Sequence, residues 1–116
     1  MTNAQLTEVL ALTDALLEAG WTRFTLEGGY RDGYPVRHCL LGALAVALAE
    51  CLGQRLADPV GDALCTLLLD LLPAGSERTG GACQLTHSRL VHFNDYAPSR
   101  RRVRALVQRA ARSLTK

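Results

Sequence analysis

Cys39 is the side chain in this sequence whose position best suits chemistry. It follows Arg37 and His38 and begins a long apolar run, so we expect it in the first turn of a helix. Unpaired backbone N–H groups and the positive end of the helix dipole favour a thiolate there, and the two basic neighbours add to the same field. The pattern therefore predicts a nucleophilic cysteine.

The groups that would assist such a thiol lie near residue 92. His92 would act as the base and Asn94 or Asp95 as its orienting group, as in papain-like thiol enzymes. In a strand, His92 and Asn94 would project on one face. In a helix, His92 would pair with Asp95 or Tyr96, and Asn94 would point elsewhere. The N–H groups of the first turn after the thiol would serve as oxyanion donors.

A structural interpretation accounts for the same residues. Cys39 would be a packing residue and His92 would be solvated. Asn94 and Asp95 would cap the turn before the last helix, since Asn and Asp commonly form turns. Because a cysteine–histidine pattern does not transfer between families, two functions stay open. One is a small cysteine-dependent enzyme of acyl-transfer or hydrolytic type, acting on a small molecule or a peptide. The other is a non-catalytic helical binding or regulatory module.

A metal site is a further alternative. Cys83 and His87 have Cys-x3-His spacing, and His92 or Cys39 would have to complete the set of four ligands. Zinc sites normally show two tight ligand pairs, and only one is visible in this sequence. We therefore assign no metal ligand and no cofactor.

The elements that position these residues are organised around residues 39–52. In this run of 14 residues Glu50 is the only charged one, and a helix that is apolar on every side must be covered on every side. A membrane span needs about 20 residues, so we expect a buried core helix. Its bulky ridge would consist of Leu41, Leu44, Leu48 and Leu52, and its small-residue groove of Gly42, Ala45 and Ala49.

The rest of the chain predicts helices that cover this core. A capping box of Thr2 and Gln5 opens a helix over residues 3–19, and Gly20 would end it in the left-handed conformation with Trp21 folded back on the last turn. Residues 22–37 contain turn signals and predict a loop or a short β-hairpin.

The C-terminal half continues this pattern. Asp58-Pro59 predicts the start of a further helix, residues 84–96 fit a helix or a strand, and Pro98-Ser99 opens the last helix. We therefore expect a mainly α fold. Residues 1–116 would form a single domain, a compact bundle of four to five helices around residues 39–52, with the excursion at 22–37.

The net charge of +2 conceals a basic C-terminal segment. Residues 96–116 hold seven of the 13 Lys and Arg residues and no acid, and Arg102 and Arg109 recur seven residues apart. No aromatic residue is interleaved and the rest of the chain is acidic, so nucleic acid is a weaker expectation than a protein partner or a second copy of the chain. Docking of this helix beside Asp58, Asp62 and Asp70 would also explain its charge. The candidate binding residues are Trp21, His38, Arg101, Arg104 and Arg112.

The four cysteines indicate a reducing compartment. They show no Cys-x-x-Cys spacing, and Cys51 and Cys65 lie inside apolar helical runs, where thiols behave as small hydrophobes. The N-terminal residues show no basic segment followed by an apolar one. We therefore expect a cytoplasmic protein that does not insert in a membrane.

Four short motifs, read in order, resemble those of a known family. They are Gly20-Trp21, then Cys39-Leu-Leu-Gly-Ala-Leu44, then Phe93-Asn94-Asp95, and last Val103-x-x-Leu106-x-x-x-Ala110. Together they resemble a family of small bacterial proteins catalogued as a domain of unknown function (number 6197). The sequence departs from that pattern at Phe93, where we expect Trp, and at His92, where we expect no histidine. The resemblance spans most of the chain and implies no established activity.

Overall fold

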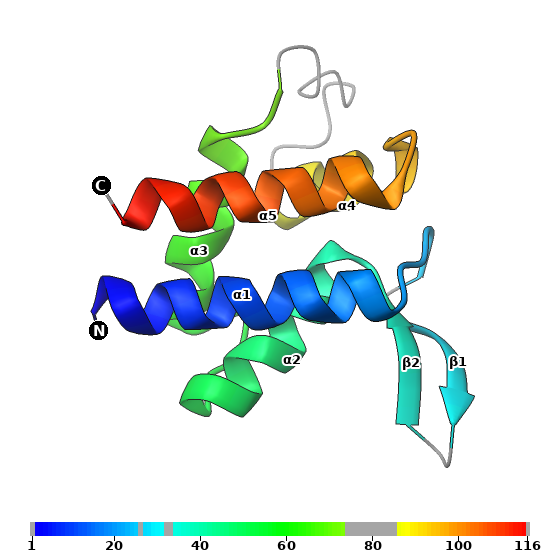
Figure 1. Ribbon diagram of the computed structural model, residues 1–116, viewed down its shortest axis with the longest axis horizontal. Coiled ribbons are helices and arrows are strands. Elements are labelled where there is room, and N and C mark those ends of the chain that lie inside the picture. The colour runs from blue at the N-terminus through cyan, green and yellow to red at the C-terminus, as the bar shows by residue number, and fades with distance from the viewer. Residues whose placement is uncertain (1, 26, 32–33, 74–85, 116) are drawn as a thin grey trace.

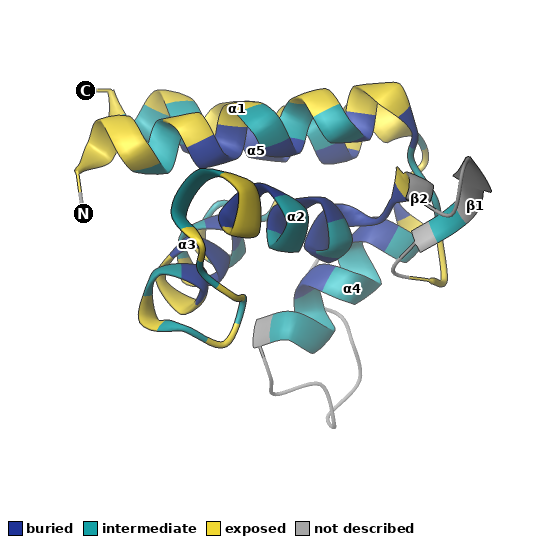
Figure 2. Ribbon diagram, turned by 90° about the horizontal axis from the view of Figure 1, so that it is seen from below, coloured by how far each residue is buried: buried dark blue, intermediate teal, exposed yellow. Residues whose placement is uncertain are grey.

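Figure 1 shows the computed structural model, which describes residues 2–25, 27–31, 34–73 and 86–115. The elements in these ranges are, in order, α1 (Asn3–Ala19), β1 (Glu27–Arg31), β2 (Tyr34–His38), α2 (Leu40–Leu52), α3 (Pro59–Asp70), α4 (Thr86–Tyr96) and α5 (Arg100–Leu114). α1 and α5 lie side by side and antiparallel in one layer, and α2, α3 and α4 form a second layer against them (Figure 2). The predicted mainly α, single-domain bundle is confirmed.

Local sequence signals set the ends of α1. The hydroxyl of Thr2 accepts the N–H of Gln5, and the side chain of Gln5 accepts the N–H of Thr2, as the capping box predicts. The C-terminal end differs from the prediction, because Gly20 has an extended backbone with φ −174° and ψ 116°. The chain therefore leaves α1 in an extended direction and carries Trp21 toward the second layer, and the predicted left-handed ending is wrong.

The strands Glu27–Arg31 and Tyr34–His38 form a β-hairpin, which is one of the two predicted alternatives. β1 and β2 pair antiparallel, with Glu27 opposite His38 and Arg31 opposite Tyr34. His38 also forms a parallel bridge with Trp21, in which its N–H donates to the carbonyl of Gly20. The hairpin thereby ties the end of α1 to the start of α2.

α2 is the central helix that the apolar run predicts. It begins after Cys39 and ends at Gly53, whose φ of 61° places it in the left-handed region that glycine favours. The core of the protein contains six of its residues, which are Leu40, Leu41, Ala43, Leu44, Ala47 and Leu48.

The predicted cover of α2 on every side is wrong. Ala49 and Glu50 are exposed, and Gly42 and Ala45 are half-buried, so the predicted small-residue groove faces outward. The small residues that let neighbouring helices approach are Ala43 and Ala47, which are fully buried. Ala45 and Ala49 are four residues apart, and so are Ala43 and Ala47, so each pair lies on one face of the helix. The sequence alone does not show which of the two faces packs against a neighbouring helix.

The remaining helices close the core. Pro59 opens α3 as predicted, although the carboxylate of Asp58 accepts the N–H of Arg55 at 2.7 Å and caps no N–H of the helix. Residues 86–96 form a helix, which settles the alternative between helix and strand. The inner face of α5 consists of the buried residues Val103, Leu106, Val107 and Ala110. Among the described residues no helix has the length and apolar character needed to cross a bilayer.

Candidate functional site

Cys39 caps the N-terminus of α2. Its backbone is extended, and its sulfur accepts the N–H of Gly42 at 3.3 Å, so the thiol sits one residue before the first turn. The side chain is 4% exposed. Burial raises the pKa of the Cys39 thiol and the charge of Asp95 raises it further, although backbone N–H groups act in the opposite direction. Burial therefore opposes the expected thiolate, and the backbone N–H groups at the start of α2 offset this effect only in part.

Asn94 forms the polar centre beside this thiol. Its side chain is fully buried. The carbonyl oxygen of the side chain accepts the indole N–H of Trp21 at 2.7 Å and the backbone N–H of Leu40 at 3.0 Å. The amide nitrogen donates to the carbonyl of Thr22 at 3.1 Å and to the carboxylate of Asp95 at 3.1 Å. We call these five residues the Asn94 network. It joins the end of α1, the start of α2 and the last turn of α4.

The Asn94 network uses the full hydrogen-bonding capacity of the Asn94 side chain. A buried side-chain amide has one acceptor oxygen and two N–H donors, and each of its atoms has a partner here. The Asp95 carboxylate also accepts the backbone N–H of Phe24 at 2.8 Å. Both residues therefore hold the segment after α1 in place. Asn94 was expected to cap the turn before the last helix. Its side-chain oxygen instead accepts the N–H of Leu40, the first residue of α2.

His92 lies on another side of α4 from Asn94. Residues two apart in a helix point in nearly opposite directions, so the contact of Asn94 with α2 turns His92 away from Cys39. The His92 ring packs on Tyr96 at 4.6 Å between centroids, as predicted for a helix over this segment. The structure brings Cys39, Asn94 and Asp95 together, and it does not bring the His92 ring to the thiol.

The predicted binding residues fall into two groups, because Trp21 and His38 form a bridge at the hairpin and the three arginines belong to α5. Trp21 is half-buried, with the guanidinium of Arg23 stacked 4.6 Å above its ring, and His38 is buried at the hairpin. Arg101 and Arg112 are exposed on α5.

Arg104 is the exception on α5, because it contacts α1. It donates to both oxygens of Asp14, at 2.8 and 3.3 Å, and lies 3.4 Å from the carboxylate of Glu18. The hydrogen bond to Asp14 raises the pKa of Arg104. The predicted acidic partners on residues 58–70 are therefore wrong, and α1 supplies them instead.

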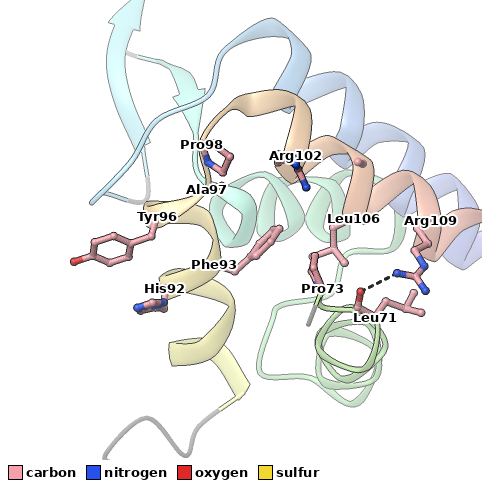
Figure 3. A pocket seen from close by; sticks show the side chains of 11 residues that line it. Leu71, Pro73, His92, Phe93, Tyr96, Ala97, Pro98, Arg102, Leu106 and Arg109 are labelled. Carbon is pink, nitrogen blue, oxygen red and sulfur yellow. Dashed lines mark hydrogen bonds between the residues drawn. The ribbon is translucent and has the colours of Figure 1, made fainter. Parts of the chain in front are cut away.

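A groove lies between α4 and α5 and extends to the end of α3 (Figure 3). Its volume is about 530 Å³. Figure 3 shows Phe93 of α4 directed toward Leu106 of α5 and toward Pro73, which follows α3. The residues that line it, which we call the α4–α5 groove, are Leu71, Pro73, His92, Phe93, Tyr96, Ala97, Pro98, Arg102, Ala105, Leu106 and Arg109.

The charge of the α4–α5 groove is cationic. Arg102 and Arg109 line it and no carboxylate does, among the residues that the structure describes. Arg109 donates to the carbonyl of Leu71 at 3.4 Å and so also caps the end of α3. A second hollow of about 340 Å³ shares Leu71 and Arg109 and extends the groove to Arg112. The pair of arginines seven residues apart was visible in the sequence, but its apolar neighbours come from three segments and were not.

No metal centre is found in the described part of the chain. In those ranges no group of three or more His, Cys, Asp and Glu side chains is placed to hold an ion. Cys83, one of the two residues of the Cys-x3-His pattern, lies outside the described residues.

Comparison with known families gives one match. The sequence profile of a family described as a Family of unknown function (DUF6197) matches residues 1–113. The chain belongs to this family. A search of curated proteins and a search of solved structures each found no match. Three of the motifs behind the predicted resemblance, those at Trp21, Cys39 and Asn94, meet in the Asn94 network.

Proposed function

We propose that this protein is a non-catalytic binding module that holds an acidic, apolar peptide segment of a protein partner in the α4–α5 groove. The observation that carries the proposal is the composition of the groove. Phe93, Leu106 and Pro73 give it an apolar floor, two arginines stand at its border, and no described lining residue is acidic. Apolar side chains gain from burial on such a floor, and carboxylates gain from the arginines.

The spacing of the arginines gives the expected spacing of the acids. Arg102 and Arg109 are seven residues apart on α5, which corresponds to about 10 Å along a helix axis. Two acidic residues four residues apart in an extended peptide lie on the same face and span about 13 Å, a distance that two long arginine side chains can bridge. Neither arginine has an ion pair among the described residues, and Arg109, which donates one N–H to the carbonyl of Leu71, has further N–H donors for a partner.

Thiol catalysis has less support than binding. The thiol of Cys39 is buried with a raised pKa, and His92 packs on Tyr96. A cysteine enzyme needs an accessible thiolate within hydrogen-bond reach of its base.

Nucleic acid also has less support than a peptide. Arg100 donates to the carbonyl of Glu18, and Arg104 pairs with Asp14, so α1 occupies two of the arginines that would form a phosphate track. The aliphatic floor of the α4–α5 groove suits apolar side chains better than a sugar–phosphate backbone. We therefore favour a protein partner, and the free thiols of Cys39, Cys51 and Cys65 fit the reducing cytoplasm as the place of the encounter.

A peptide selection tests this proposal. Random 12-residue peptides displayed on phage would be selected on the wild-type protein, and enriched peptides measured by fluorescence polarisation. We expect paired acidic residues beside leucine or phenylalanine in the enriched pool. The Arg102→Glu/Arg109→Glu variant should bind them at least about tenfold more weakly, as expected for the loss of two charge-assisted contacts. The absence of acidic residues from the pool would contradict the proposal.

The matched control has the same change in net charge outside the groove. Arg37→Glu/Arg101→Glu reverses two exposed arginines that do not line the α4–α5 groove. We expect it to weaken binding less than about twofold at 0.15 M salt, because screening limits distant charges. Equal losses in both double variants would indicate attraction by net charge alone.

Thiol labelling tests the competing enzyme. Iodoacetamide at pH 6, followed by mass spectrometry of each cysteine peptide, reports the reactivity of Cys39 in the folded protein. We expect Cys39 to label far more slowly than glutathione and to reach the same rate only after denaturation. Labelling faster than glutathione would support the cysteine enzyme against the binding module.

A further inference from the structure

Two large apolar side chains remain exposed beside the α4–α5 groove. Phe24 and Tyr96 are each 68% exposed, and no other large hydrophobic residue in the described part of the chain is exposed. Their rings meet edge to face, with centroids 5.7 Å apart and planes at 83°. The His92 ring packs on Tyr96 at 4.6 Å with a tilt of 32°. We call Phe24, Tyr96 and His92 the aromatic edge.

The backbone holds Phe24 in this position at a cost. Its φ of 63° is the one positive value at a non-glycine residue in the described ranges. A non-glycine side chain in the left-handed region strains the backbone, and Asp95 stabilises the conformation by accepting the N–H of Phe24 at 2.8 Å. Asp95 is itself fixed by Asn94. A strained residue whose ring faces solvent is explained better by a partner than by the stability of the free protein.

The aromatic edge is continuous with the α4–α5 groove. Tyr96 and His92 belong to both, and Figure 3 shows their rings on the outer side of α4, while Phe93, which follows His92 in sequence, faces Leu106. A chain segment lying in the groove would therefore pass the exposed ring of Tyr96 at the end of α4.

We propose that the aromatic edge binds an aromatic side chain of the same partner peptide. This inference rests on the proposed function and adds an anchor to it. The negative face and positive edge of an aromatic ring favour offset-stacked or edge-to-face contact with a further ring, and Tyr96 already has Phe24 at its edge and the tilted His92 ring beside it. The preferred ligand is an acidic segment that carries one Phe, Tyr or Trp next to its acidic pair.

Paired peptides and paired variants test the anchor. A peptide from the enriched pool that contains one aromatic residue would be compared with its aromatic-to-alanine version on wild type, Tyr96→Ala and Phe24→Gly. Glycine adopts a φ of +63° without strain, so Phe24→Gly removes the ring and leaves the backbone conformation accessible. We expect both variants to bind the aromatic peptide about fivefold more weakly and the alanine peptide less than about twofold more weakly. Arg102→Glu/Arg109→Glu should weaken both peptides equally.

The possible outcomes separate this inference from the proposed function. An enriched pool that is acidic but has no aromatic residue, or equal losses for the two peptides, would overturn the anchor and leave the groove. A pool without acidic residues would overturn the proposed function. A fluorescein-labelled 15-nucleotide oligothymidine that binds more tightly than the peptide and is lost in Tyr96→Ala would assign the aromatic edge to base stacking, and so overturn the peptide anchor.

Discussion

Asn94 is the residue on which the local structure most depends. Its side chain contacts Leu40 and Trp21, which lie 54 and 73 residues away from it in sequence. The sequence drew attention to Asn94 and Asp95, and their identities were read as orienting groups of a base. Their partners could not be predicted, because a strand and a helix over residues 84–96 aim the amide in different directions.

Asn94→Ala should be strongly destabilising. The change leaves the indole N–H of Trp21 and the backbone N–H of Leu40 without their acceptor, and each unpaired buried donor costs about 1–3 kcal/mol. We expect a loss of about 2–4 kcal/mol in the free energy of unfolding, measured in urea. Gln108→Ala, which removes an exposed amide, should cost about 0.5 kcal/mol or less. A loss under 1 kcal/mol for Asn94→Ala would show that water replaces the network.

Cys65 should make stability fall at alkaline pH. Burial raises the pKa of its thiol to about 11, whereas an unfolded thiol titrates near about 8.5. Between these values the unfolded chain has lost a proton that the folded chain retains, so the free energy of unfolding falls as pH rises from about 8.5 to 11. Cys65→Ala should flatten this slope, measured by urea unfolding from pH 7.5 to 10.5. Thr66→Ala removes no titrating group and should retain the slope of the wild-type protein. Equal slopes in wild type, Cys65→Ala and Thr66→Ala would contradict the raised pKa of Cys65.

At the scale of the element, the helices with local caps were the most predictable. The capping box of Thr2 and Gln5 fixed the start of α1, and Pro59 and Ser99 marked the starts of α3 and α5. These signals operate within one turn and need no tertiary contact. The buried face of α2 was not predictable in the same way, because Ala43 and Ala45 are chemically identical and only packing distinguishes them.

Gly61 is a packing requirement of α3 that the sequence did not reveal. A Cβ there would lie 2.6 Å from the carbonyl oxygen of Arg55 and 2.6 Å from Cα of Leu56, both backbone atoms. Helix propensity alone predicts that Gly61→Ala stabilises by about 1 kcal/mol. We expect the free energy of unfolding to fall by about 2 kcal/mol instead, because the backbone at Arg55 and Leu56 must move to make room for the Cβ. Ala63→Gly at an exposed site of the same helix is the control, and a stabilised Gly61→Ala would contradict the packing.

The pairing of α1 with α5 depends partly on one ion pair. Arg104 and Asp14 are 26% and 21% exposed and form two hydrogen bonds. A double-mutant cycle with alanine at both sites should give a coupling of about 1 kcal/mol that decreases in 1 M NaCl. The same double-mutant cycle with Arg101 and Asp14 serves as the reference and should give no coupling free energy. A salt-independent coupling would indicate packing of the arginine stem.

At the scale of the molecule, charge is distributed by packing and not by sequence position. The basic residues of the C-terminal segment divide between two places, because Arg100 and Arg104 contact α1 while Arg102 and Arg109 line the α4–α5 groove. Of this arrangement, the sequence shows only that Arg102 and Arg109 are seven residues apart. The apolar floor comes from α4, α5 and the residues after α3, so no single stretch could have predicted it.

We propose that the ligand binds in the α4–α5 groove, whereas the Asn94 network only holds the surrounding segments in place. Amide chemical-shift mapping of the ¹⁵N-labelled protein, titrated with the acidic peptide selected on wild type, tests it most directly. We predict that the largest shifts fall on residues 92–98 and 102–109, with small shifts at Trp21, Cys39 and Leu40. Shifts concentrated around Cys39 and Trp21 would contradict the claim and move the site to the thiol.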